Sequence, residues 1–195
     1  MEVQTTHVSL LQRLSDGQDP AAWQEFCDRY AELIRGFALR RDLQPADCDD
    51  VGQEVLLSLS KSMPGFQYDP SKGKFRSYLK TVTLHVILKK RMAERGQVDW
   101  ERVAQATQAA CADEDTEAAW EAEWRQYHLR RAMQTIAAEF NSADRQAFQR
   151  YALDGREVRE TAQALNLSTD QVYQAKSRIL RRLAELIEQQ VQEEG

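Results

Sequence analysis

The chain has 195 residues, of which 42% are hydrophobic and 29% charged, and only 8 are glycine and 4 proline. This length suits one large or two small domains, and the scarcity of Gly and Pro beside many helix-favouring residues predicts an all-α protein. The formal net charge of -5 argues against a protein that coats nucleic acid by bulk electrostatics.

The sequence lacks the patterns of several other functional classes. Its three cysteines and three histidines are scattered without a C-x-x-C pair, so neither a zinc site nor a disulfide framework is predicted, and a reducing compartment is expected. No segment approaches the roughly 20 apolar residues of a membrane span, and the N-terminus has no apolar signal core. A phosphate-binding G-x-x-x-x-G-K-S/T loop is also missing. We therefore expect a cytoplasmic protein that is not an enzyme, has no cofactor and does not bind a membrane.

Two helices are predicted at the N-terminal end of the chain, a short one followed by a longer one. The stretch from Thr6 to Ser15 predicts a short helix that Gly17 can close. Asp19 and Pro20 then open a longer helix as its N-cap and first-turn proline. The apolar stripe of this longer helix indicates a core rather than a cofactor site. It consists of Trp23, Phe26, Tyr30, Leu33, Ile34 and Phe37.

The next predicted helix begins at Pro45 and has an unusual outer face. Its inward positions are apolar, which leaves four residues at i, i+3, i+4 and i+7 on the other side. One interpretation is a solvated acidic face. The other is a docking surface, in which carboxylates and an amide flank an exposed leucine that a basic helical partner contacts. The four residues are Asp50, Gln53, Glu54 and Leu57.

A loop from Met63 to Lys74 follows, in which Phe66 and Tyr68 are candidate aromatic anchors. The helical period resumes at Phe75, and the new helix is rich in cations. A basic helix next to aromatic residues suits DNA phosphates and unstacked bases, and a solvated basic face is the alternative. Its cations include Lys80, Lys89, Lys90, Arg91 and Arg95.

From Gly96 to Glu123 the periodicity weakens and acids accumulate, so this stretch is interpreted as a linker, helical in part around Trp120 and Trp124. A second helical domain is expected to begin near Leu129. The acidic tail from Glu188 is expected to fray.

The C-terminal third predicts two short helices joined by a tight turn. The first covers Glu157 to Leu165, with Asn166 at a left-handed turn position, and Ser168 and Gln171 form a capping box at the start of the second. With small Ala162 at the crossing, this pattern favours a DNA-binding helix-turn-helix, while a plain helical hairpin remains the alternative. The exposed face expected on the second helix is Thr169, Asp170, Tyr173, Gln174, Ser177, Arg178 and Arg181.

Four segments of the sequence, taken in order, match the pattern of a known protein family. They read W-Q-E-F-C-D-R-Y, D-C-D-D-V-G-Q-E-V-L-L-S-L, F-R-S-Y-L-K-T-V-T and A-F-Q-R-Y-A-L-D-G followed by V-Y-Q-A-K-S-R-I-L-R-R-L. Together they resemble a bacterial RNA polymerase sigma factor of the extracytoplasmic-function type, within the sigma-70 family. The resemblance covers most of the chain. It implies a region 2 helical bundle at residues 1–95, an acidic linker at 96–126 and a region 4 helix-turn-helix at 127–190.

The resemblance also implies partners for the first domain. In this family the helix with the D-x-x-Q-E pattern docks on the clamp helices of the beta-prime chain of core RNA polymerase, and Asp50, Gln53 and Glu54 match that pattern, with Leu57 beside them. The basic helix would melt the downstream (−10) promoter element and hold its non-template strand. The residues implied in this step are Lys80, His85, Lys89 and Lys90.

Two of these positions depart from the family pattern. The family usually has Asn where this chain has His85, and Asp where it has Lys89. The family's preference at the downstream element is therefore not carried over to this chain. The added positive charge should not weaken the contact with phosphates.

The second domain would read the upstream (−35) element as duplex DNA. Gln174 suits an adenine edge, and Arg178 suits guanine or a phosphate. The acidic linker would thread towards the polymerase active centre. Region 4 residues implied in DNA contact are Thr169, Tyr173, Gln174, Ser177 and Arg178.

The function expected from the resemblance is promoter-specific transcription initiation on core RNA polymerase, bound at the beta-prime clamp helices and the beta flap. Promoter DNA is the second partner, and an anti-sigma factor is the family's usual restraint. Two alternatives remain from the residues alone. One is a stand-alone helix-turn-helix transcription regulator, which usually binds paired half-sites as a dimer. The other is a helical adaptor without a nucleic-acid role, which the net acidity would suit.

Overall fold

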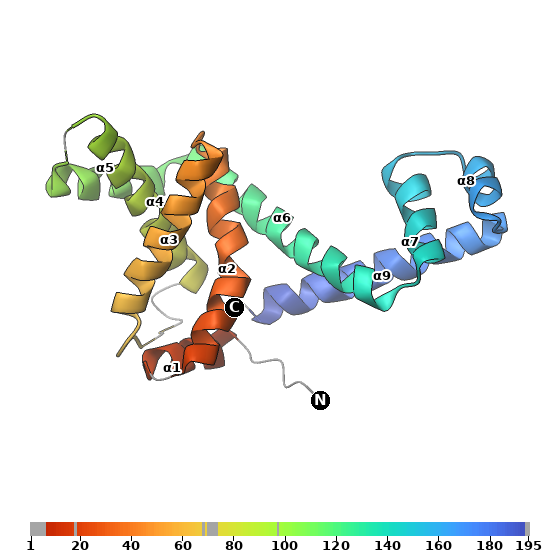
Figure 1. Ribbon diagram of the computed structural model, residues 1–195, viewed down its shortest axis with the longest axis horizontal. Coiled ribbons are helices and arrows are strands. Elements are labelled where there is room, and N and C mark those ends of the chain that lie inside the picture. The colour runs from red at the N-terminus through yellow and green to blue at the C-terminus, as the bar shows by residue number, and fades with distance from the viewer. Residues whose placement is uncertain (1–6, 18, 68, 70–73, 97, 194–195) are drawn as a thin grey trace. The chain divides into compact units, whose positions relative to one another are not determined.

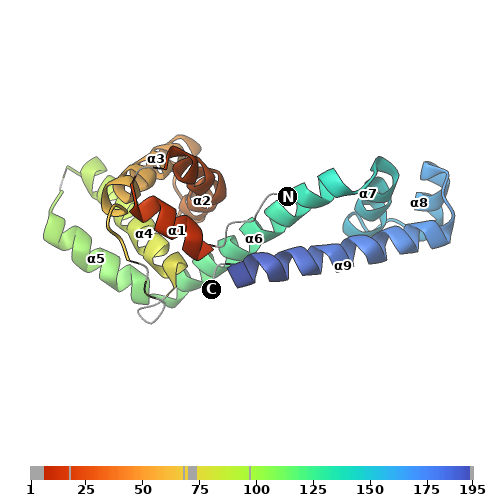
Figure 2. The same cartoon turned by 90° about the horizontal axis from the view of Figure 1, so that it is seen from below.

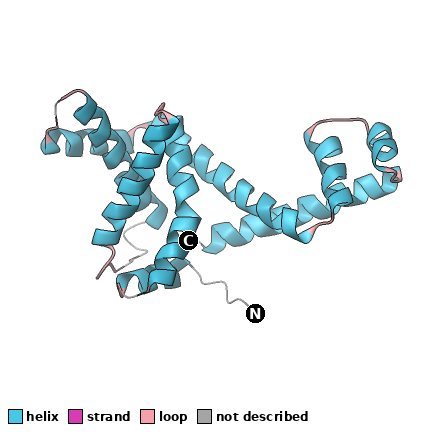
Figure 3. Cartoon of the chain, viewed as in Figure 1, coloured by secondary structure: helices cyan, strands magenta, loops and turns pink. Residues whose placement is uncertain are grey.

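The computed structural model describes residues 7–17, 19–67, 69, 74–96 and 98–193. Every regular element in these residues is a helix (Figure 3), which confirms the predicted all-α class. None of the described helices is both long and apolar enough to cross a membrane. The chain divides into two compact units, of which the first reaches Tyr127 and the second runs from His128 to Gln192. Thr6 and Tyr68, both used in the sequence analysis, lie outside the described residues.

The first unit is a bundle of amphipathic helices (Figures 1 and 2). Asp19 caps its second helix as predicted, because its carboxylate accepts the backbone N–H of Ala22 at 3.0 Å, and Pro20 is the first helical residue. Phe66 stacks on Tyr78 and so anchors the loop after the third helix. The helices are α1 (His7–Ser15), α2 (Pro20–Arg40), α3 (Pro45–Ser62), α4 (Phe75–Glu94), α5 (Trp100–Ala112) and the first half of α6 (Glu114–Glu139).

The largest side chains buried in the core of the first unit are aromatic. Phe26 of α2 lies against Tyr30, with 4.7 Å between ring centroids, and meets Phe75 of α4 edge to face at 5.9 Å. Trp120 of α6 meets Phe37 of α2 edge to face at 4.9 Å, and both rings are fully buried. Such pairs contribute about 0.5–1.5 kcal/mol beyond their buried area. The start of α6 is therefore part of this core.

The structure differs here from the acidic linker expected at residues 96–126. Most of that stretch forms α5 and the first half of α6, and Trp120, Trp124 and Tyr127 bury one side of α6 in the first unit. Three acids of α6 pair with cations of α2 and α4, while Glu114 and Asp115 are exposed. The ion pairs are Arg40 with Glu123, Arg76 with Glu121 and Lys80 with Glu117. The acids interrupt the apolar pattern from which a helix is predicted. Their partners lie in other helices, so the local sequence does not show that these acids are paired.

The second unit is built on local capping signals that the sequence predicted. Asn166 has φ 55° in the left-handed region and ends the first helix of the predicted pair. Gln171 N–H donates to Ser168 Oγ at 3.1 Å, and Ser168 N–H donates to Gln171 Oε1 at 2.7 Å, which confirms the capping box. The elements are the second half of α6, α7 (Ser142–Phe148), a π-helical turn (Gln149–Leu153), α8 (Val158–Leu165) and α9 (Thr169–Glu193).

The C-terminal tail corrects another expectation. The sequence predicted fraying from Glu188, yet α9 continues to Glu193. Gln190 is 8% exposed, and its Oε1 lies 2.8 Å from His128 Nδ1. Two turns earlier in α9, the Arg182 guanidinium donates two hydrogen bonds of 2.7 Å to the Glu139 carboxylate and lowers the pKa of that carboxyl. These contacts between distant residues hold the helix in register, which local propensity alone does not.

A close approach of α6 to α2 at Gly36 generates the first testable prediction. A Cβ at Gly36 would clash with Oε1 of Glu123, whose buried carboxylate accepts a bond from Arg40 at 2.7 Å. We expect Gly36→Ala to lower the free energy of unfolding by about 1–2 kcal/mol, despite the better helix propensity of Ala, because the carboxylate must leave its partner. Urea denaturation followed by tryptophan fluorescence measures this change.

The matched control is Gly52→Ala in α3, where an added Cβ meets nothing within 4 Å. This change should raise the free energy of unfolding by about 0.5–1 kcal/mol, since it carries only the propensity gain. Stabilisation by both substitutions would show that the approach at Gly36 does not constrain the fold.

Candidate functional site

The outer face of α3 carries the four residues predicted to dock on a protein partner. Leu57 is 55% exposed, and Asp50 and Gln53 are also exposed, while Glu54 is half-buried. Leu57 and Glu54 line a surface hollow together with Ser58. An exposed leucine beside charged groups and a hollow is suited to a partner helix.

The lysines of α4 are paired with carboxylates within the first unit. Lys89 bonds Glu54, and Lys90 lies 2.9 Å from Asp47 and 3.2 Å from Asp50. Hydrogen bonding to Asp47 raises the pKa of the Lys90 ammonium. The structure thus joins two predicted surfaces that sequence reasoning treated separately, because Asp50 and Glu54 hold cations that were predicted to contact DNA.

These pairs differ in how readily they can exchange partners. The side chains of Lys89 and Glu54 are both partly exposed, so their pair contributes about 0.2–1 kcal/mol and is easily replaced. Lys80 is 7% exposed and bonds Glu117 of α6. Breaking a buried pair by removing one partner is costly. A DNA contact by Lys80 therefore requires Glu117 to release it, whereas Lys89 and Lys90 already lie near the surface.

His85 lies on α4 beside a residue that the sequence analysis did not single out. Its ring is within 13° of parallel to Trp100 of α5, with 6.4 Å between centroids, and Lys89 Nζ lies 5.4 Å from the Trp100 centroid. Trp100 was assigned to the linker, and a linker residue is not expected to meet α4. The signal that pointed to it was a tryptophan directly after Asp99, a residue type that caps helices.

In the second unit, α9 turns its apolar side to the core and its polar side outward. Val172, Ala175 and Ile179 are fully buried. The opposite side bears the residues predicted to read duplex DNA, of which Thr169 is half-buried and the others are exposed. The exposed ones are Tyr173, Gln174, Ser177 and Arg178.

Two of these exposed residues are held by neighbours in the same unit. Tyr173 packs edge to face on Tyr151, with 5.5 Å between centroids, and the charge of Tyr151 raises the pKa of the Tyr173 phenol. Arg178 donates to Asp144 of α7 at 2.9 Å. The Arg178 guanidinium has five donors, so this contact orients it without using all of them.

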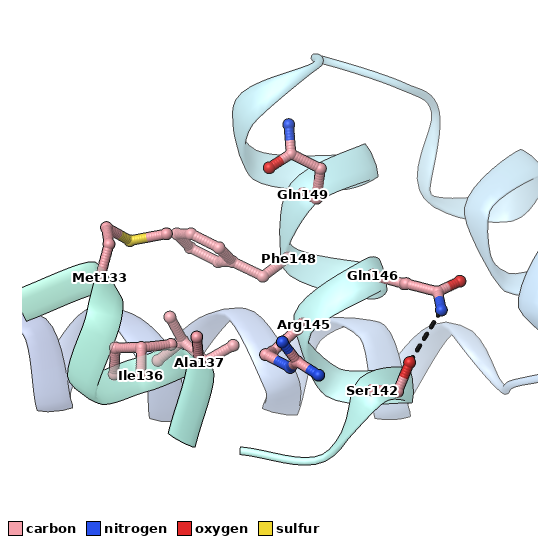
Figure 4. Close-up of a pocket in the computed structure, with 9 residues that line it drawn as sticks. Met133, Ile136, Ala137, Ser142, Arg145, Gln146, Phe148 and Gln149 are labelled. Atoms are coloured by element: carbon pink, nitrogen blue, oxygen red, sulfur yellow. Dashed lines mark hydrogen bonds between the residues drawn. The ribbon is translucent and has the colours of Figure 1, made fainter. Parts of the chain in front are cut away.

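A groove of about 420 Å³ lies among α6, α7 and α9 in the second unit (Figure 4). Met133 points towards the ring of Phe148, and Ile136 lies beside them. On the rim, Gln146 donates to Ser142 Oγ at 2.9 Å. An apolar floor with a polar rim is typical of a binding groove. The sequence analysis did not predict it, because its walls come from three helices.

Within the described ranges, no cluster of three or more His, Cys, Asp or Glu side chains is placed to hold a metal ion. The cysteines there are free thiols at Cys27, Cys48 and Cys111. Burial raises the pKa of the Cys27 and Cys48 thiols, which disfavours their reactive thiolate forms. The arrangement on both units is therefore one of binding surfaces.

Comparison with known proteins finds a family match within the first unit. Residues 26–96 match the protein-family model for Sigma-70 region 2, and this range runs from Phe26 in α2 to the end of α4. No curated protein matches the chain. A solved structure, "Structure of CnrH in complex with the cytosolic domain of CnrY", is 17% identical over 92% of this chain and 95% of that chain, with a TM-score of 0.31. A TM-score that low carries no argument about this chain.

The contact between α3 and α4 is testable by a double-mutant cycle on Glu54→Gln and Lys89→Gln. We expect a coupling energy of about 0.3–1 kcal/mol in the free energy of unfolding, smaller at high salt, because the pair is only partly buried. Trp23, Trp100, Trp120 and Trp124 all lie in the first unit, so tryptophan fluorescence reports its unfolding.

Lys90→Gln combined with Glu54→Gln is the matched control, since Lys90 bonds Asp47 and Asp50 rather than Glu54. Its coupling energy should be close to zero. Equal coupling in the two cycles would contradict the specific pairing of Lys89 with Glu54.

Proposed function

We propose that the chain is a member of the sigma-70 family and acts as a sigma factor of the extracytoplasmic-function type, with region 2 at residues 26–96, which match the family model for that region. It binds core RNA polymerase and directs transcription initiation at specific promoters. The observation that carries the proposal is the position of the family match, which covers both the outer face of α3 and the cations of α4. As a polymerase subunit it would act in the cytoplasm and would not itself be an enzyme.

The polymerase-docking surface is the outer face of α3. Leu57 supplies an exposed apolar contact, and Asp50, Gln53 and Glu54 surround it with acceptors for basic groups. The clamp helices of the beta-prime chain are the proposed partner. Charged groups around an apolar centre favour one orientation of the partner and speed its association.

The ion pairs between α3 and α4 support a function that depends on polymerase. In the free chain, Glu54 holds Lys89 and Asp50 contributes to holding Lys90. A basic partner that engages these carboxylates leaves the Lys89 ammonium available for the phosphates of the downstream element, while Lys90 keeps its pair with Asp47. Docking and capture of single-stranded DNA are thereby linked through the same side chains, and the free protein should bind promoter DNA weakly.

The second unit is proposed to read the upstream element with α9. Its exposed face combines an amide at Gln174, a hydroxyl at Ser177 and a guanidinium at Arg178. Gln174 suits adenine, and Arg178 suits guanine or a phosphate once it exchanges Asp144 for DNA. Thr169 and Tyr173 lie on the same helix, nearer its N-terminus, and complete the proposed contact surface.

The groove among α6, α7 and α9 is the proposed site for the polymerase beta flap. Its floor of Met133, Ile136 and Phe148 offers apolar contact area, and its rim offers amides and the Arg145 guanidinium. These features suit an apolar segment of a protein partner. An anti-sigma factor remains a proposed regulator on the basis of the resemblance.

The polymerase contact is tested by pull-down with core enzyme. Leu57→Ser, and separately Gln53→Ala combined with Glu54→Ala, should each weaken retention by about 10-fold or more, because both remove contacts at the centre of the proposed interface. Leu153→Ser is the matched control, since Leu153 is 54% exposed but lies in the second unit. Retention of the α3 variants at the level of this control would refute the docking surface.

The upstream contact is tested with reconstituted holoenzyme on a promoter found by run-off transcription from a genomic library. Arg178→Ala should weaken binding by about 1–3 kcal/mol and change preference at one base position if Arg178 reads a base. Asp144→Asn keeps Arg178 and removes its charged partner, so binding should not weaken. A loss with Arg178→Ala that is equal on every sequence would assign Arg178 to a phosphate instead.

The same promoter separates the proposal from a stand-alone regulator. A gel shift with the purified protein alone should show weak binding, and addition of core polymerase should make it specific. Strong sequence-specific binding without polymerase would favour the stand-alone regulator.

A further inference from the structure

Trp100 is the most exposed of the large hydrophobic side chains in the described residues. It is 61% exposed at the first position of α5, where α5 packs along α4 (Figure 2). The buried core of the first unit includes Trp120 and Trp124 but not Trp100. Single exposed apolar residues are common on protein surfaces. The groups that surround this indole are what distinguish it.

An imidazole and an ammonium group adjoin the Trp100 indole. The His85 ring lies within 13° of parallel to the indole at a centroid distance of 6.4 Å, and Lys89 Nζ lies 5.4 Å from the indole centroid. Both residues are on α4, one turn apart, so they share a face of that helix. Two flat rings and a cation are thus collected at one edge of the contact between α4 and α5.

The charges near this cluster favour an anionic ligand. Lys89 is in the cluster itself, and Arg95 and Arg102 are exposed at the adjoining ends of α4 and α5. Two acids flank Trp100 in the chain. Asp99 is the N-cap of α5, where its carboxylate accepts the N–H of Glu101 at 2.9 Å, and Glu101 itself lies in the first turn of α5. A carboxylate in that position offsets the unpaired N–H groups of the helix end.

We propose that Trp100, His85 and Lys89 form a stacking site for one unpaired DNA base. The indole and imidazole supply flat faces for the base, and Lys89 supplies a positive charge for the neighbouring phosphate. A base in duplex DNA has both faces covered by its neighbours, so the site selects single strands. This inference rests on the proposed function and adds Trp100, which lies beyond residues 26–96 of the family match, to the residues that hold the melted strand.

Lys89 connects this site to the docking surface. Its ammonium bonds Glu54 while it lies over Trp100. A partner that engages Glu54 leaves Lys89 to the phosphate beside the stacked base. The stacking site should therefore bind single-stranded DNA more tightly in the holoenzyme than in the free chain.

The test uses full-length protein bound to core polymerase and a labelled single strand of mixed sequence, about 12 nucleotides long. Trp100→Ala should weaken binding of this strand by roughly 5- to 150-fold, the range found when a stacking aromatic is removed. Trp100→Tyr should retain most of the affinity, because a smaller ring still stacks. Leu153→Ala, which removes an exposed apolar group from the second unit, should leave it unchanged.

Retention on core polymerase and circular dichroism are measured for every variant. Trp100 is exposed, so the fold should be unaffected. The stacking site is refuted if Trp100→Ala binds the strand as tightly as wild type. It is also refuted if the loss of strand binding is matched by an equal loss of retention on core polymerase. If wild type itself is not retained by core polymerase, the proposed function fails, and this result is distinct from both.

Discussion

The charges of α4 are the constraint around which the first unit is assembled. Burial of apolar side chains supplies most of its stability, but apolar contacts are not directional and tolerate several helix registers. The lysines of α4 meet carboxylates from two sides, Lys80 from α6 and Lys89 and Lys90 from α3. Each partly exposed pair contributes little energy. A different alignment of the helices, however, would bury charges without partners or bring like charges together. The pairs therefore specify how the helices align more than they stabilise them.

The same pairs give the proposed function its dependence on polymerase. A chain with a net charge of -5 that also neutralises its own lysines has little long-range attraction for DNA. Exchange of an intramolecular carboxylate for a phosphate becomes favourable only when another cation takes that carboxylate. Weak, partly exposed pairs suit this exchange, because a strong buried pair would resist it. In the pair of Lys80 with Glu117 the lysine is buried and the glutamate is partly exposed, so this ammonium is the costliest in α4 to leave without its partner.

The second unit differs, because local capping chemistry sets where α9, the proposed recognition helix, begins. Asn166 ends α8, and the capping box of Ser168 and Gln171 begins α9 after a short turn. Burial of Val172, Ala175 and Ile179 then decides which side of α9 faces solvent. Contacts with α6 and α7 hold this face in place, since Ile179 packs with Ile136 and Asp144 of α7 orients Arg178.

The sequence by itself determined the all-helical class, the caps, the helix pair near the C-terminus and the outer face of α3, because these depend on contacts within a few residues. Only the tertiary structure decided that the acidic stretch packs as helices in the first unit, that Glu54 pairs with Lys89, and that Trp100 lies beside α4. The physical reason is separation along the chain. Glu54 and Lys89 are 35 residues apart, and Arg40 and Glu123 are 83 apart. Periodicity and capping carry no information about which distant charge or ring a side chain will meet.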